Sequence, residues 1–339
     1  MSTMKDVAKA ANVALSTVSL ALRNDPKVKE VTRRRILEVA RELQYRPNGI
    51  ARDLKTRRTD TICILLHDLG GPFYSELIRG VQDVATSRGY NTIASGSLGG
   101  RNGSAVRLMS EHRVDGVIVL APDVDDDIII QSAAEDLPVV VLDRDLTADF
   151  VYSVRVDNEQ GGYLVTRHLL EMGHQRIVFV SGPADTLDAE LRYRGYLKAM
   201  REFSAPESKR FDYNGQFTEQ GGYTVGKVLG AQSELPDAVF ASNDEMALGI
   251  LRAFEEKGIR VPEDVALAGF DNIRIAQYVR PPLTTVQQPM YEMGAVAAQL
   301  LFQALGGSHV LESVQLATNL VVRQSSQRNG HGSTAKKQI

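Results

Sequence analysis

Residues 6–22 read DVAKAANVALSTVSLAL, and this stretch near the front of the chain decides the first part of the fold. Its apolar positions form two short stripes at helical spacing, over residues 4–11 and 15–22. Asn12 separates them, and asparagine tolerates the left-handed backbone that a tight turn between helices often requires. A third helix fits VTRRRILEVARELQY (31–45), with Thr32 as its expected N-cap. Three short helices with a tight first turn predict a helix-turn-helix module over residues 1–46.

The charge of the chain is distributed unevenly. Residues 1–60 carry 14 Lys or Arg against 7 Asp or Glu, a net charge of +7, whereas the whole chain has a net charge of −3. The remaining 279 residues therefore carry −10. A basic head on an acidic body indicates a polyanion such as DNA as the partner of the head alone. The alternative is a solvated basic surface on a small helical bundle, because arginine is also a good helix former.

From Thr59 onward, short apolar runs alternate with amphipathic helical patterns. The runs are TICILLH (61–67), VDGVIVLA (114–121), LPVVVLD (137–143), RIVFVSG (176–182), DAVFAS (237–242) and DVALAGF (264–270). Continuous Val, Ile and Leu, without polar alternation, is typical of parallel strands covered on both faces. We therefore expect an α/β fold with two doubly wound parallel-sheet units. The polar end of the chain, residues 325–339, is expected to be disordered.

Cysteine content and hydropathy bear on the compartment. Cys63 is the single cysteine, so no intramolecular disulfide can form, and its apolar surroundings predict a small buried hydrophobic residue. The N-terminus lacks the pattern of a secretion signal, and no stretch approaches the ~18 apolar residues of a membrane helix. We expect a cytoplasmic protein with no membrane partner.

Signatures of catalysis are missing. The six histidines include no HExxH pair, and one cysteine is too few for a structural zinc pattern. No GxxxxGK[ST] phosphate loop and no GxSxG elbow occurs, and SGSLGG (95–100) lacks the spacing of a dinucleotide loop. The sequence therefore predicts no enzyme, no cofactor and no metal.

Three stretches together resemble the LacI/GalR family of bacterial transcription factors. They are DVAKAANVALSTVSLAL, TRRRILEVARELQYRPNGIARDL (32–54) and ASNDEMALGILRAFEEKGIRVPEDVALAGFDN (241–272). The resemblance covers residues 3–324 and implies a DNA-binding headpiece (1–46), a hinge helix (47–58) and a core similar to periplasmic sugar-binding proteins. It assigns residues 59–158 and 289–324 to the first core subdomain and residues 159–288 to the second.

The resemblance also implies a function. It is that of a homodimeric regulator, a repressor of carbohydrate genes, which binds a pseudo-palindromic operator and responds to an allosteric effector in the cleft between the subdomains. The polar tail shows no leucine heptad, so the tetramer-forming helix of some relatives is not expected.

Contacts to DNA are expected from the second helix, whose first residues enter the major groove, and from the hinge helix. By motif position Leu54 is the residue that the family inserts into the minor groove, where an apolar wedge unstacks a base step and bends the duplex. Leu20 stands where many relatives have arginine, so it can touch a thymine methyl but cannot pair with guanine. The operator sequence therefore stays open, with Lys27 as a further base-reaching side chain. The full set of expected DNA contacts is Met4, Lys5, Leu15, Ser16, Thr17, Ser19, Leu20, Arg23, Lys27, Lys29, Thr32, Asn48, Ala51, Arg52 and Leu54.

Effector contacts carried over from the family follow the predicted strands, where open α/β sheets bind ligands. They are Asp68, Phe73, Tyr74, Asp143, Arg144, Arg192, Phe217, Asn243 and Asp271. Carboxylates, an amide and guanidinium groups match sugar hydroxyls, and a phenylalanine can stack on a sugar face. Most also have a structural alternative: helix capping for Asn243 and Asp271, pairing with an acid for Arg192, pairing with each other or with another loop for Asp143 and Arg144, and packing for the phenylalanines.

Two further readings stay open. VRPPLTTVQQPMYEMGAVAAQLL (279–301) is similar to the catabolite-control branch of the family, whose corepressor is a phosphorylated carrier protein. Arg192 and Asn243, which that branch lacks, favour a small sugar or sugar phosphate, with the phosphoprotein corepressor as the alternative. A solute-binding protein without a DNA role is the rival from another class, although it would have no use for residues 1–58.

Overall fold

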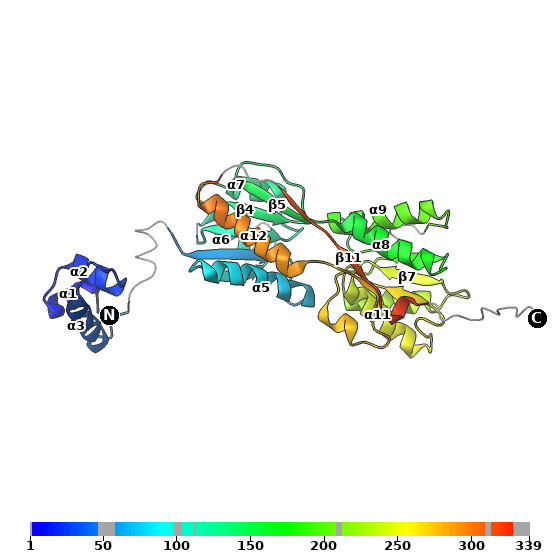
Figure 1. Cartoon of the computed structure of the whole chain (residues 1–339), viewed down its shortest axis with the longest axis horizontal. Coiled ribbons are helices and arrows are strands. Elements are labelled where there is room, and N and C mark those ends of the chain that lie inside the picture. Colours follow the sequence, from blue (N-terminus) through cyan, green and yellow to red (C-terminus); the bar gives the residue numbers. More distant parts are fainter. Residues whose placement is uncertain are drawn as a thin grey trace, which may run out of the picture. The chain divides into compact units, whose positions relative to one another are not determined.

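The computed structural model describes residues 2–46, 58–97, 104–111, 113–207, 212–308 and 313–327. Its chain forms two compact units, residues 1–59 and residues 60–339, each with its own core (Figure 1). Within the described residues, no helix is both long and apolar enough to cross a bilayer.

The first unit consists of three helices. These are α1 (Met4–Ala11), α2 (Leu15–Leu22) and α3 (Glu30–Glu42) (Figure 1). Thr3 and Asp6 form a capping box at the start of α1, and Asn12 ends it with a left-handed φ of 52°. Val7, Val18 and Ile36, one from each helix, are fully buried together. The predicted helix-turn-helix is confirmed, including the role of Asn12 in its turn.

The start of α3 differs from the prediction. Thr32 was expected to cap this helix, but α3 begins at Glu30 and the capping position, at Lys29, lies three residues earlier than expected. A carboxylate in the first turn is favourable at the positive end of the helix dipole. Glu30 also pairs with Arg33 at 2.8 Å and with Arg34 at 3.1 Å. Thr32 therefore lies inside the first turn of the helix.

The second unit contains two subdomains, each built on a parallel sheet. The first subdomain has a six-stranded sheet in the order β10-β5-β4-β3-β1-β2. Its strands are β1 (Thr61–Leu66), β2 (Asn91–Gly96), β3 (Gly116–Leu120), β4 (Val139–Leu142), β5 (Val151–Val156) and β10 (Val314–Leu316). Its helices are α5 (Pro72–Ser87), α6 (Ser104–Ser110), α7 (Asp126–Ser132) and α12 (Met290–Leu305).

Both faces of this sheet are covered. Alternate residues of β1 serve two cores: Ile62 and Ile64 pack with α5 and α12, whereas Cys63 and Leu65 pack with α6 and α7 (Figure 1). Burial raises the pKa of the Cys63 thiol to about 12, as suits a packing residue. The continuous apolar runs of the sequence therefore do indicate buried parallel strands.

The second subdomain has a three-stranded parallel sheet in the order β6-β7-β8. These strands are Ile177–Val180, Ala238–Ala241 and Ala266–Ala268. Helices α8 (Asn158–Glu171) and α9 (Leu187–Glu202) cover one face, and α10 (Glu219–Leu229) and α11 (Asp244–Glu256) cover the other. A small antiparallel sheet of β9 (Thr285–Gln287) and β11 (Asn319–Val321) and the short helices η2 (Arg274–Gln277) and η3 (Gln324–Ser326) complete it.

Three segments cross between the subdomains: β5 to α8, β9 to α12, and β10 to β11 (Figure 1). The last crossing corrects the expected boundaries. Residues 317–324 were assigned to the first subdomain and residues 325–339 to a disordered tail, but β11 pairs with β9 of the second subdomain. Ser325 and Ser326 are buried there, and the Ser325 hydroxyl donates to the Leu267 carbonyl at 2.6 Å. Residues 328–339 lie outside the described part of the chain.

Candidate functional site: a DNA-binding surface and an interdomain cleft

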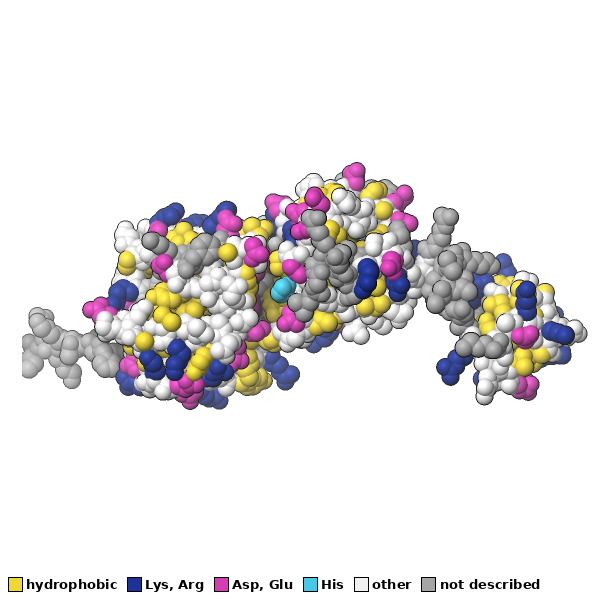
Figure 2. Space-filling model, turned by 180° about the vertical axis from the view of Figure 1, so that it is seen from behind, with side chains coloured by type: hydrophobic (Ala, Val, Ile, Leu, Met, Phe, Trp, Pro, Cys, Tyr) yellow, Lys and Arg dark blue, Asp and Glu magenta, His cyan; other side chains and the backbone are white. Residues whose placement is uncertain are grey.

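The described DNA-contact candidates are concentrated on α2 and the segment after it. Leu15 and Ser16 are exposed at the start of α2, whereas Thr17, Ser19 and Leu20 are half-buried. Leu15 is 43% exposed, so its side chain is accessible to a partner. Figure 2 shows Lys and Arg side chains over the visible face of this unit. The start of α2 therefore presents a mixed apolar and hydroxyl surface beside basic residues.

The basic side chains divide into two groups. Lys5, Lys27 and Lys29 are exposed. Arg23 folds back on α2, where its guanidinium donates to the Ser19 hydroxyl at 2.8 Å. Arg33 holds the loop before α3 by donating to the carbonyls of Asp25 and Val28, so it has a structural role.

Met4 and Leu20 pack in part against the small core of this unit, and Thr32 is half-buried in α3. The hinge-helix candidates Asn48, Ala51, Arg52 and Leu54 lie outside the described residues.

A cavity of about 1250 Å³ opens between the two subdomains, and we call it the cleft. All nine effector candidates line it: Asp68, Phe73, Tyr74, Asp143, Arg144, Arg192, Phe217, Asn243 and Asp271. They follow β1, β4, β6, β7 and β8, in the helices and loops beyond these strands. The segments beyond the carboxyl ends of the strands in both sheets thus line the cleft, which is where open α/β sheets bind ligands.

Arg192 on α9 is the central cation of the second subdomain, and its side chain is only 3% exposed. It donates from Nε to the Asn158 Oδ1 atom at 2.9 Å and from Nη1 to the Ser242 carbonyl at 2.6 Å. Its Nη1 and Nη2 atoms lie 3.6 Å from carboxylate oxygens of Asp271 and Asp188, respectively. The guanidinium also stacks 3.9 Å from the centre of the Phe270 ring. Arg192 therefore both pairs with acids and lines the cleft.

Specific hydrogen bonds and ring contacts also hold other candidates in place. Asn243 caps α11 through the Met246 N–H, and its Nδ2 donates to the Phe217 carbonyl at 2.9 Å, so it both caps a helix and lines the cleft. Asp271 is no helix cap; its Oδ1 accepts from the Gln288 Nε2 atom at 2.6 Å. Phe73 and Tyr74 meet edge to face at 5.3 Å.

Asp143 and Arg144 do not pair with each other. Asp143 accepts a hydrogen bond from the Val156 N–H at 2.9 Å. Arg144 donates to the carbonyls of Ala121, Pro122 and Val124 and lies 3.1 Å from a carboxylate oxygen of Asp126.

Strained backbone occurs in the cleft as well as elsewhere among the described residues. Asp143, Gln216, Phe217 and Asp271 all line it and all have positive φ, with Asp271 at 111°. Such conformations cost about 1–3 kcal/mol each for residues other than glycine and are found where function requires them. The strain is therefore consistent with a binding site.

Burial and neighbouring acids shift the titration of the lining groups. Burial raises the pKa of Asp271 to about 7, against the opposing effect of Arg192. Burial and the Asp188 carboxylate raise the pKa of Asp143 to about 7. The pKa of Tyr74 rises to about 12 because of burial and the carboxylates of Asp68, Asp188, Glu245 and Asp271. Asp271 and Asp143 can therefore both accept and donate hydrogen bonds near neutral pH.

A pH dependence of stability follows from these shifts. The pKa of Asp271 is higher in the folded protein than its ordinary 3.8, so the folded state retains a proton that the unfolded chain releases between pH 4 and 7. The free energy of unfolding should therefore fall as the pH rises through this range. Asp271→Asn should make this fall less steep, as measured by urea unfolding from pH 4.5 to 7.5. Equal slopes for both proteins would show that Asp271 titrates normally.

Sequence reasoning missed several lining residues. The charged ones are His67, Asp123, Asp125, Asp126, Asp145, Asp185, Asp188 and Glu245. The His67 Nδ1 atom lies 3.0 Å from Asp123, which also accepts a hydrogen bond from the Ser97 hydroxyl at 2.6 Å. His67 directly follows β1, and Asp188 precedes Arg192 by one helical turn, so the strand-end rule and the helical period could have indicated both. Among the described residues, no group of His, Cys, Asp and Glu side chains could hold a metal ion.

A helix-turn-helix unit joined to a two-subdomain core with a buried polar cleft defines a class of protein: a DNA-binding regulator that senses a small molecule. Comparison with known proteins agrees with this class. Residues 3–48 match the family model "Bacterial regulatory proteins, lacI family", and residues 166–326 match the periplasmic binding protein-like domain.

Similar proteins match this chain over 80–96% of its length. Catabolite control protein A of Priestia megaterium is 36% identical over 95% of this chain and 98% of its own. The Lac repressor dimer bound to operator and the anti-inducer ONPF matches with a TM-score of 0.82 at 27% identity, covering 96% of this chain and 99% of that one. A LacI family regulator of Enterococcus faecium with bound ribose matches with a TM-score of 0.72 at 32% identity, covering 80% and 100%.

The chain belongs to the LacI family of bacterial transcriptional regulators. It is therefore a DNA-binding regulator of transcription and not an enzyme, as the sequence predicted.

Proposed function

We propose that this protein is a cytoplasmic, homodimeric repressor that binds a pseudo-palindromic operator and that an uncharged carbohydrate in the cleft controls its affinity for DNA. The observation that carries the effector part is the cleft itself, in which strained backbone, a buried guanidinium and aromatic rings surround a cavity of about 1250 Å³. The relatives with bound ribose and with operator and ONPF support the same assignment.

The charge of the cleft favours an uncharged sugar over a sugar phosphate. Ten of its described lining residues are carboxylic acids, against two arginines and one histidine. Both arginines are already engaged, Arg144 by three carbonyls and Asp126, and Arg192 by Asn158, Ser242 and two carboxylates. A phosphate group would enter a negative field in which carboxylates already balance the charge of both arginines, whereas neutral hydroxyls can accept from spare guanidinium N–H groups and donate to the carboxylates.

The phosphoprotein corepressor is the weaker candidate. The similarity to catabolite control protein A favours it. Against it, the buried Arg192 and Asn243 and the strained loops around them build a site of small-molecule size. A protein docked on the outer surface would leave that site without a purpose.

Two measurements test the proposal. A duplex selected by the protein from a random pool should be pseudo-palindromic, and its affinity should fall steeply with salt because bound phosphates release counterions. Thermal unfolding should then be followed with ribose, galactose, glucose, cellobiose and glucose 6-phosphate, because a ligand of the folded state stabilises it by mass action. A shift with a neutral sugar and none with the phosphate is expected. Failure to select any duplex would contradict the regulator, and a shift with only the phosphate would contradict the uncharged effector.

A further inference from the structure

Both members of the buried Arg192–Asp271 pair are hydrogen-bonded to amide side chains that lie on segments crossing between the subdomains. Asn158 belongs to the crossing from β5 to α8, and Gln288 belongs to the crossing from β9 to α12. Both amides are buried, with 1% and 3% of their surfaces exposed. Neither was singled out by the sequence, because each looks like an ordinary polar residue near the end of an element.

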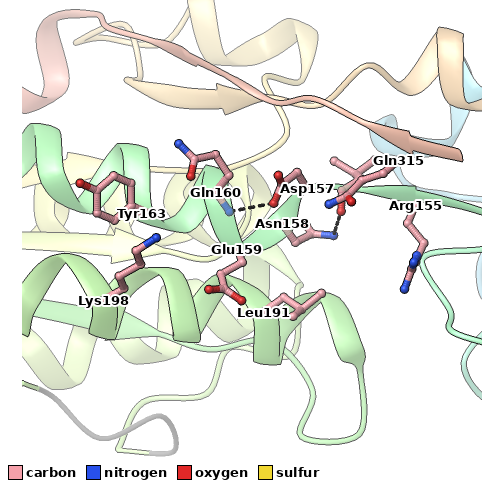
Figure 3. Close-up of a pocket in the computed structure, with 10 residues that line it drawn as sticks. Arg155, Asp157, Asn158, Glu159, Gln160, Tyr163, Leu191, Lys198 and Gln315 are labelled. Carbon is pink, nitrogen blue, oxygen red and sulfur yellow. Dashed lines mark hydrogen bonds between the residues drawn. The ribbon is translucent and has the colours of Figure 1, made fainter.

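Asn158 is the first residue of α8 and connects Arg192 to the first crossing. Its Oδ1 accepts from the Arg192 Nε at 2.9 Å, and its Nδ2 donates to the Val156 carbonyl at 3.4 Å. Figure 3 shows Asn158 beside a cavity of about 360 Å³, with Arg155 and Gln315 on one side and Leu191 and Lys198 of α9 on the other. The Asn158 side chain therefore connects the Arg192 guanidinium directly to the crossing from β5 to α8.

Gln288 makes the corresponding connection for Asp271. Its Nε2 donates to the Asp271 Oδ1 at 2.6 Å. Their backbones are also joined: the Asp271 N–H donates to the Val286 carbonyl at 2.8 Å, and the Gln288 N–H donates to the Asp271 carbonyl at 3.4 Å. The strained loop that carries Asp271 is thus fixed to the second crossing.

The third crossing is joined to the first. The Asp157 N–H donates to the Leu316 carbonyl at 2.9 Å, and the Thr318 hydroxyl donates to the Asp157 carbonyl at 3.2 Å. A change in backbone direction at residues 156–158 would therefore involve residues 316–318 as well. All three crossings are connected, directly or through one another, to the charged pair of the cleft.

We propose that Asn158 and Gln288 are positioning residues that couple the occupancy of the cleft to the relative arrangement of the two subdomains. The inference rests on the proposed function, because it requires an effector that contacts Arg192 and Asp271. A sugar bound to this pair fixes the side chains that the two amides hold. Rotation of one subdomain against the other changes the backbone from which the amides project. Without the amides, sugar binding and subdomain rotation can each occur without the other. The coupling free energy between sugar and DNA is then lost, although the protein still binds both.

The chemistry of the two connections has opposite polarity. A guanidinium can only donate, so residue 158 must accept. Above its pKa of about 7 the Asp271 carboxylate is mostly ionised and accepts, so residue 288 must donate when the measurements are made at pH 8. Asn158→Asp keeps the acceptor for Arg192 and loses only the 3.4 Å hydrogen bond to the Val156 carbonyl, so it should keep the coupling. Gln288→Glu removes the donor and places a second carboxylate against Asp271, so it should abolish the coupling. Leucine at either position removes the hydrogen bond at similar volume.

The experiment measures the affinity of the protein for the selected duplex with and without a saturating sugar. The sugar is whichever of ribose, galactose, glucose or cellobiose raises the melting temperature of the wild-type protein most. The wild-type ratio of the two affinities should be at least about fivefold. Asn158→Leu, Gln288→Leu and Gln288→Glu should bring this ratio to within about twofold of one, while sugar-free operator affinity stays near that of the wild type. Asn158→Asp and the control Gln160→Leu, an exposed residue on the same turn, should keep the wild-type ratio.

The possible outcomes are distinguishable. Unchanged ratios in both leucine variants would overturn the inference. Loss of coupling in both Asn158→Asp and Asn158→Leu would also overturn it, because packing would then explain the effect. Loss of sugar binding in the leucine variants would overturn it as well, because the amides would then only support the binding site. If a leucine variant unfolds, the opposite behaviour of Asn158→Asp and Gln288→Glu still decides. A wild-type protein that binds DNA but responds to none of the sugars contradicts the proposed effector before any variant is considered.

Discussion

Arg192→Met should remove the response of this protein to sugar while leaving its operator binding in the absence of sugar within a few fold of the wild type. The arginine is the central cation of the second subdomain's side of the cleft and lies far along the chain from the DNA-binding unit. A guanidinium has five N–H groups, and the hydrogen bonds to Asn158 and the Ser242 carbonyl use only two of them, so the others can donate to a sugar. Hydrogen bonds to charged groups contribute about 1.5–3 kcal/mol each, so loss of two such bonds to the sugar weakens its binding by roughly a hundredfold or more. The sugar-induced thermal shift and the change in duplex affinity should therefore both disappear.

A control is needed because the substitution also leaves Asp271 buried without its cation. Arg192 holds the pKa of Asp271 below the value that burial alone would give, so in Arg192→Met this pKa should rise further. Breaking one side of a buried pair costs about 3–5 kcal/mol, whereas replacing both charges is much milder. The double variant Arg192→Met with Asp271→Asn should therefore recover stability but not the sugar response. Survival of the sugar response in Arg192→Met would remove this residue from the site.

The sequence predicts the parts of the fold that local patterns determine. The helical stripes around Asn12 and the continuous apolar runs identify the helix-turn-helix and the doubly covered parallel strands. Both features depend on residues within a few positions of one another. The nine effector candidates came from the family resemblance, and their place in the cleft agrees with the rule that the carboxyl ends of parallel strands meet at one edge.

The sequence does not predict what long-range polar contacts determine. Ser325 and Ser326 read as the start of a disordered tail, yet they are buried because Ser325 donates to Leu267 and Ser326 contacts His168 at 2.8 Å, 158 residues away. Asn158 and Arg192 are 34 residues apart, and Gln288 and Asp271 are 17 apart. A buried polar group satisfied by a distant partner leaves no periodicity and no local motif, so only the folded structure shows it.

The second large effect is expected in the first unit, where Val18→Asp should abolish operator binding and leave the sugar-induced stabilisation of the core intact. Val18 is fully buried on α2 against Val7 and Ile36, in a three-helix core that has few apolar side chains to spare. An unpaired carboxylate there costs several kcal/mol, which is comparable to the whole stability of so small a unit. Loss of α2 should lower duplex affinity by at least about a thousandfold, to the non-specific level or below.

Val31→Asp is the matched control, because it adds the same charge to the same unit at a position that is 83% exposed. Its effect should be confined to repulsion from DNA phosphates, about tenfold or less in affinity at moderate salt. Anisotropy titrations of the selected duplex measure both variants, and thermal unfolding with the sugar probe reports the core. If the protein were a solute-binding protein without a DNA role, the wild type, Val18→Asp and Val31→Asp would give indistinguishable titrations. Equal losses in the two variants would instead show that charge, and not the fold of the first unit, governs binding, because only the buried position disrupts the packing that presents Leu15 and Ser16.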